Sequence, residues 1–165
     1  SYMRLAEVYL AYAEALNETG RKDEACKWLD KTRNRVGLPS MTDELLHRLH
    51  RGKALPSYPE CALAGDAELR EEILDERARE FAFEEIRWFD IVRWKRADIF
   101  QQTLYGIRVT ILDGTDSSNF RFNFSEPIPE TDRAWKNSFD PKWYLSAFPS
   151  NEVNKGYGLT QNAGW

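Results

Sequence analysis

The residues best suited to chemistry lie in the segment 76–94, where acidic and basic side chains recur at helical spacing. Glu76, Glu80 and Glu84 follow one another at intervals of four, so a helix would place the three carboxylates on one face. Arg87 falls on the same face. Such a row fits a metal site or an acid–base pair. A di-metal bundle would also require Glu-x-x-His pairs on facing helices, and a glycosidase would require two carboxylates about 5–9 Å apart across a sugar.

Aromatic residues crowd this carboxylate row and favour a structural role for it. Buried carboxylates need hydrogen-bonded cationic partners, and Arg77, Arg87 and Arg93 are close in the sequence. We therefore expect an ion-pair network that holds the fold together. Catalysis by the row and a protein interface are the alternatives.

The two histidines, His47 and His50, are spaced to share one helical turn. No third ligand accompanies them at metal spacing unless Cys61 folds back, so we expect a solvated surface helix there. No Ser-His-Asp, Cys-His or phosphate-loop pattern occurs in the chain. The sequence therefore predicts no catalytic residue, no metal site and no cofactor.

Aromatic side chains in the last third of the chain are the candidate ligand-binding residues. They contribute to an aromatic content of 13%, more than a core of this size needs. Flat rings on irregular chain can stack on the C–H face of a sugar, while nearby polar groups bind its hydroxyls. The alternative is that the rings clamp the tail onto the core. The residues selected for ligand contact are Trp135, Trp143, Tyr144 and Arg133.

The overall composition is that of one globular domain of 165 residues. A net charge of −4 and a pI of about 5.3 disfavour nucleic-acid binding, which requires a basic surface. A hydrophobic content of 42% disfavours disorder, and no apolar run is long enough for a membrane-spanning helix. Ser1 leads directly into a helical pattern, so we expect a fragment of a longer chain.

Residues 1–37 are predicted to form an antiparallel pair of helices. The first, over about residues 3–18, is placed to end at Gly20, because glycine adopts left-handed φ/ψ at low cost. The second, over about residues 22–35, ends at Gly37. Since the connection is short, the helices must pack side by side, and their small residues have a tetratricopeptide-like spacing. The expected inward-facing residues are Leu5, Tyr9, Tyr12 and Leu16, and then Ala25, Trp28, Leu29 and Thr32.

The middle of the chain combines a loop and a long helix. Prolines and glycines break residues 38–66, where only a short helix around Asp43–His50 is expected. Asp66 is a suitable N-cap for a long helix over 67–95, with a kink or break near Glu85–Arg87. The far end of this helix is apolar on more than one side and is expected to be buried, including Phe81, Phe83, Trp88, Phe89 and Trp94.

Residues 96–165 change from helical to strand periodicity. Two alternating apolar runs, centred on Val109 and Phe122, flank a turn-rich link and predict a β-hairpin. Several prolines follow, so the remaining tail is expected to be irregular chain pinned by aromatic rings. The fold class is therefore mainly α, with a small β-hairpin and an aromatic-rich C-terminal tail, in a single domain 1–165.

Three stretches of the chain resemble the SusD/RagB family. Arg4–Asn17 is similar to the helix that opens the C-terminal half of these proteins, and Leu159–Trp165 is similar to their usual ending. Leu69–Trp94 resembles their central signature, although the family often has glycine where this chain has Glu85. The stretch 40–66 has the character of a local insertion. The matching signature residues are Glu76, Arg77, Glu80, Phe83, Glu84, Arg87, Trp88, Phe89, Asp90, Arg93 and Trp94.

The resemblance implies a helical-repeat, tetratricopeptide-like SusD-type fold, of which this chain would be the C-terminal part. The family comprises outer-membrane nutrient-binding lipoproteins of Bacteroidetes, held at the cell surface by a lipid anchor that would lie outside this chain. Its members bind oligosaccharides, starch among them, or sometimes peptides. They do so without catalysis and deliver the ligand to a TonB-dependent SusC-like transporter during polysaccharide utilisation. The alternative is a helical interaction module that docks on the transporter and has no ligand site of its own.

Overall fold

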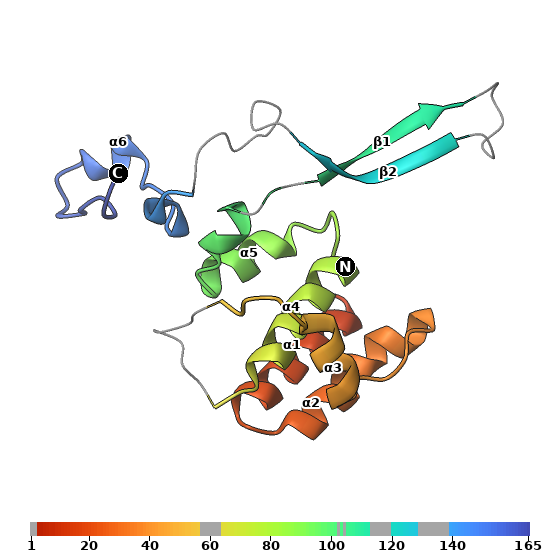
Figure 1. The fold of residues 1–165 in the computed structure, drawn as a ribbon. Helices are drawn as coiled ribbons and strands as arrows, with labels where there is room; N and C mark the ends of the chain where they lie inside the picture. Colours follow the sequence, from red (N-terminus) through yellow and green to blue (C-terminus); the bar gives the residue numbers. More distant parts are fainter. Residues whose placement is uncertain (1–2, 57–63, 102, 104, 113–119, 129–138) are drawn as a thin grey trace. The chain divides into compact units, whose positions relative to one another are not determined.

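A computed structural model describes residues 3–56, 64–101, 103, 105–112, 120–128 and 139–165. Within these residues the chain is mainly helical, with a small two-stranded antiparallel sheet (Figure 1), which confirms the predicted fold class. The chain divides into two compact units, Ser1–Lys95 and Arg96–Trp165. No helix in the described part of the chain has the length and apolar character needed to cross a membrane.

The predicted helix pair is confirmed as α1 (Leu5–Glu18) and α2 (Lys22–Arg33). Gly20, at φ +77°, follows α1, and the amide of Arg21 donates to the carbonyl of Leu16 at 2.9 Å, so a Schellman turn reverses the chain. A 3₁₀ helix, η1 (Asn34–Val36), extends α2 and ends at Gly37, which also has positive φ. The glycines thus end both helices where the sequence predicts.

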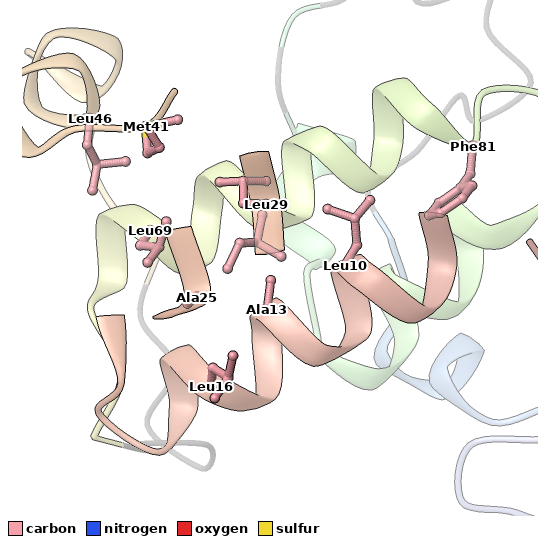
Figure 2. Packing of buried hydrophobic residues seen from close by; sticks show 10 residues of the cluster. Leu10, Ala13, Leu16, Ala25, Leu29, Met41, Leu46, Leu69 and Phe81 are labelled. Carbon is pink, nitrogen blue, oxygen red and sulfur yellow. The ribbon is translucent and has the colours of Figure 1, made fainter. Parts of the chain in front are cut away.

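The core of the first unit lies between α1, α2 and α4 (Ala67–Glu80), as Figure 2 shows. Ala13 of α1 and Ala25 of α2 are fully buried, and their small side chains permit close packing of the helices. Trp28 contacts the rings of Tyr9 and Tyr12. Two of the expected inward-facing residues are exposed: Leu5 at 63%, because the buried stripe of α1 starts one turn later, and Tyr12 at 43%. The largest core residues are Leu10, Leu16, Leu29, Leu46, Leu69, Ile73 and Phe81.

The helix expected over 67–95 is two helices. α4 ends at Glu80 and α5 spans Ile86–Arg93. Between them Phe83 and Glu85 have φ values of +66° and +63°, and left-handed backbone cannot continue a right-handed helix. The predicted break near Glu85–Arg87 is therefore real but begins a few residues earlier.

The break also changes which aromatic residues are buried. Phe81 and Trp94 are buried as expected, whereas Phe83 is fully exposed, Phe89 is 66% exposed and Trp88 is 37% exposed. The prediction of a wholly buried end was wrong because α5 buries only the side that carries Asp90 and Ile91.

The short helix predicted at Asp43–His50 is confirmed as α3. The side chain of Thr42 caps it by accepting from the amide of Leu45 at 3.2 Å. The expectation of a solvated surface helix holds for only part of it. His47 is exposed, but Leu46 and His50 are buried against the core.

The second unit contains the predicted hairpin, formed by β1 (Tyr105–Ile111) and β2 (Phe120–Pro127). Their antiparallel register places Val109 opposite Phe122 and is shifted by a bulge between Gly106 and Arg108. The remaining described elements are short helices, one before the hairpin and two after it. They are η2 (Ala97–Gln101), η5 (Pro141–Tyr144) and α6 (Ser150–Val153).

Candidate functional site

Two of the four selected ligand residues, Trp143 and Tyr144, are described, and both lie on η5. Arg133 and Trp135 fall outside the described residues. The side chain of Asp140 accepts from the amide of Lys142 at 3.1 Å and caps the start of η5, where proline occupies the first position. This local sequence fixes the backbone that presents the two rings, which are each half-buried.

The rings of Trp143 and Tyr144 belong to an aromatic cluster centred on the buried Phe139. Trp143 meets Phe139 edge-on at 5.6 Å between ring centroids, and Tyr144 lies at 4.7 Å. Phe100 stacks on Phe139 at 5.1 Å. The hydroxyl of Tyr144 also accepts from the amide of Ala97 at 3.0 Å. These two rings therefore join η5 to η2 within the second unit, and their exposed portions remain available to a ligand.

The sequence ending 159–165 has a structural function. The side chain of Gln161 accepts from the amide of Phe148 at 2.8 Å and donates to its carbonyl at 2.9 Å. The indole of Trp165 donates to the carbonyls of Lys142 and Leu145. The Gln-Asn-x-Gly-Trp ending thus closes the tail back onto η5.

The carboxylates of the signature row are held in ion pairs. Glu76 contacts Arg79 at 2.9 Å, and Glu80 contacts Arg4 at 2.9 Å and Arg35 at 2.6 Å. Glu84 also binds Arg4, at 2.7 Å. Hydrogen bonds from Arg4 to Glu84 and Glu80 raise the pKa of the Arg4 guanidinium above its ordinary value. The expected ion-pair network is present, and it occupies the carboxylates that catalysis would need.

The arginine partners differ from those expected. Arg77 and Arg93 instead bind Asp90, and Arg93 also binds Glu14 of α1. Arg87 donates to the carbonyl of Leu74 at 3.0 Å. The row itself is also shorter than predicted, because Glu84 lies beyond the end of α4 and outside the helical face.

The two histidines have different surroundings. His47 Nδ1 lies 2.6 Å from Glu68 on an exposed surface, whereas the buried Nε2 of His50 lies 3.7 Å from Glu72 without a hydrogen bond. In the described part of the chain, no three His, Cys, Asp or Glu side chains are placed to hold a metal ion. Cys61, the remaining conceivable ligand, lies outside the described residues.

Two grooves of the first unit were not predicted from the sequence, because a concave surface depends on the three-dimensional path of the chain. The signature groove, of about 620 Å³, is lined among others by Arg4, Glu7, Arg77, Glu85, Phe89 and Arg93. The α3 groove, of about 570 Å³, is lined among others by Ser40, Thr42, Glu44, His47, Arg48 and Arg51. Both volumes fall in the range of small-molecule sites. The spacing of Arg48 and Arg51 on one helical turn is the sequence signal for the second groove.

Comparison with known proteins gives a consistent assignment. The model of the family described as "SusD family" matches residues 1–165. The chain is 40% identical over 94 residues to SusD-like protein P2 of Formosa agariphila, an alignment that covers 56% of this chain and 16% of that protein. It also superposes on the crystal structure of a SusD-like protein from Bacteroides fragilis with a TM-score of 0.66 and 33% identity, over 99% of this chain and 25% of that one.

The alignments thus span about a quarter of the solved relative and a smaller share of the curated one. The family match nevertheless extends over the whole sequence, including the ion-paired signature and the ending that closes the tail. The chain belongs to the SusD family.

Proposed function

We propose that this chain takes part in non-catalytic capture of oligosaccharides at the bacterial cell surface and in their delivery to a TonB-dependent SusC-like transporter. Membership of the SusD family across all 165 residues is the observation that carries the proposal. In this proposal the chain is part of an outer-membrane lipoprotein, attached to the membrane only through a lipid anchor.

The ion pairs of the signature support binding without turnover. Glu76, Glu80 and Glu84 each contact at least one arginine, and Glu80 contacts two. These contacts engage the carboxylate oxygens with guanidinium groups, whereas a general acid or base must face a bound substrate. The carboxylates therefore act as scaffold in the proposed function.

The proposed sugar contacts are the aromatic residues of the tail, namely Trp143 and Tyr144 together with Trp135 and Arg133. The support for Trp143 is its half-buried position on a capped helical turn, because a ring held by Phe139 loses little freedom when a sugar stacks on it. A pyranose would stack on the exposed part of the ring, with Arg133 binding its hydroxyls.

Binding to a panel of immobilised neutral and acidic polysaccharides tests the proposal. We expect retention by at least one polymer, reduced at least tenfold in Trp135→Ala or Trp143→Ala. Tyr157→Ala is the matched control, because Tyr157 is an exposed aromatic of the same tail outside the proposed site. Equal retention of all variants would reject the proposed sugar contacts. If no polymer retains the unchanged chain, the proposed function is rejected.

A docking module without a ligand site is the second candidate. It is favoured by a stripe of exposed apolar residues on α1, formed by Leu5, Val8 and Tyr12 at helical spacing. This candidate predicts that Leu5→Lys with Val8→Lys abolishes co-purification with the SusC-like transporter. Retained co-purification would reject the stripe as the docking surface.

A further inference from the structure

Arg48 and Arg51 differ from every other arginine of the first unit. The nine others, from Arg4 to Arg93, each lie within 4.0 Å of a carboxylate. The side chains of Arg48 and Arg51 make no hydrogen bond or ion pair with a described residue, and both line the α3 groove. In a unit whose arginines are otherwise paired, the two unpaired guanidinium groups therefore share one cavity.

The geometry of α3 keeps the two arginines on the same side. Arg48 is in the last turn and Arg51 is the C-cap residue, three positions later, so both project from neighbouring positions of one helical end. The helix is held in place by the buried Leu46 and His50 and by its Thr42 cap. The guanidinium groups are thus carried by an ordered element, and Pro39, Ser40 and Thr42 also line the groove.

The remaining groove residues add polar contacts. The hydroxyl oxygen of Thr42 accepts the capping hydrogen bond, which leaves its proton to donate elsewhere. His47 is already bound to Glu68 at 2.6 Å. Glu44 is the carboxylate of the lining and makes no ion pair with Arg48. With two arginines against one glutamate, the groove carries a positive charge on a protein whose net charge is −4.

Guanidinium groups bind oxyanions through paired N–H donors, and they do so more strongly than they bind neutral hydroxyls. We propose that the α3 groove binds the anionic group of an acidic saccharide, with Arg48 and Arg51 as the recognising residues. The anionic group is a uronate carboxylate or a sulfate ester, which share this chemistry. The inference rests on the proposed glycan-binding function and adds a class of ligand and a second contact region to it.

Three immobilised polymers separate the possible ligands: polygalacturonate presents carboxylates, dextran sulfate presents sulfates, and dextran presents neither. Biolayer interferometry would measure binding of the full chain and of two double variants with equal loss of charge. The double variant Arg48→Gln with Arg51→Gln removes both guanidinium groups from the groove. Arg21→Gln with Lys27→Gln removes two exposed cations of α2 and its N-terminus. Circular dichroism would verify that helix content is unchanged in both.

The expected result is binding to polygalacturonate or to dextran sulfate that falls at least tenfold in the groove variant and stays within twofold in the α2 variant. Binding should also weaken as salt increases, because exposed charges are screened. Equal losses in both variants, or no binding of the unchanged chain to either acidic polymer, would overturn the inference. If a neutral polysaccharide still binds in that case, the proposed glycan-binding function stands and only the inference on the α3 groove fails. If no polysaccharide binds, the proposed function and the inference both fail.

Discussion

Arg77 of α4 and Asp90 of α5 form a buried ion pair, with 2.8 Å between Nε and Oδ2. The guanidinium also lies over the ring of Phe81, and the other carboxylate oxygen of Asp90 accepts two hydrogen bonds from Arg93. Because the backbone leaves helical geometry between Phe81 and Glu85, this pair connects α4 and α5 directly across the break. The signature of the family thus includes the residues that fix the angle between the two helices.

Replacing Asp90 tests this role. Asp90→Asn removes the negative charge and leaves the buried Arg77 uncompensated, so we expect a loss of about 3–5 kcal/mol in the free energy of unfolding. Urea denaturation followed by circular dichroism measures it. Glu152→Gln, which breaks an exposed pair with Lys155, is the matched control and should cost less than about 1 kcal/mol. Similar costs for the two variants would contradict a structural role for Asp90.

Glu85 is expected to be destabilising where it stands. Its φ of +63° is a conformation that glycine adopts without the penalty of about 1–2 kcal/mol that a Cβ brings. Glu85→Gly should therefore raise the free energy of unfolding by about 1 kcal/mol. Lys27→Gly, in the exposed middle of α2, should lower it by a similar amount. A fall in stability for both variants would show that the side chain of Glu85 contributes more than its backbone costs.

Gly65 lies where α4 begins and where the end of α1 leaves no space. A Cβ on Gly65 would lie 2.9 Å from the carbonyl oxygen of Asn17 and 2.8 Å from its side-chain amide. That amide donates to the carbonyl of Asp66 at 3.0 Å, so the three residues are held together. Gly65→Ala should cost about 1–3 kcal/mol by thermal or urea unfolding. Ala64→Ser, at the exposed neighbour, should be close to neutral, and a neutral Gly65→Ala would refute the close approach.

Asp66 links stability to pH. Desolvation by burial acts to raise its pKa, but hydrogen bonds from the amide of Leu69 and from Lys22 outweigh that effect and hold the pKa below its ordinary value. The charged carboxylate therefore stabilises the fold above the unfolded pKa of about 3.9, and this contribution is lost as pH falls through the lower folded pKa.

Comparing the chain with Asp66→Asn isolates this charge, since asparagine also caps a helix. We expect the unchanged chain to be the more stable at pH 7, with the difference in unfolding free energy shrinking as pH falls below about 4. The measurement is urea denaturation at several pH values. A difference that stays constant with pH would mean that the charge of Asp66 contributes nothing.

Local sequence patterns predicted the elements of the first unit well. Glycines at positions 20 and 37 end their helices, and apolar spacing places Leu10 and Leu16 in the core. Alternation around Val109 and Phe122 likewise predicted the hairpin. These signals work because capping, periodicity and strand alternation depend on neighbouring residues.

Pairings between distant residues were not predictable in the same way. Glu80 binds Arg4, which is 76 positions away in the sequence, and spacing within the signature offers no information on that partner. Phe89 is exposed because the chain breaks after α4, where Glu85 has positive φ. No glycine at this position signals that backbone conformation in the sequence. For the candidate site, the aromatic content of the tail indicated rings such as Trp143, but packing on Phe139 determines how much of each ring remains accessible.

The most direct test of glycan capture without catalysis measures binding and turnover on the same sample. The chain would be incubated with each polysaccharide of the panel, and retained protein and newly formed reducing ends would be measured together. We expect retention by at least one polymer with no reducing ends above those of a protein-free control. Release of reducing ends by the unchanged chain that disappears in a folded Glu80→Gln variant would contradict capture without catalysis.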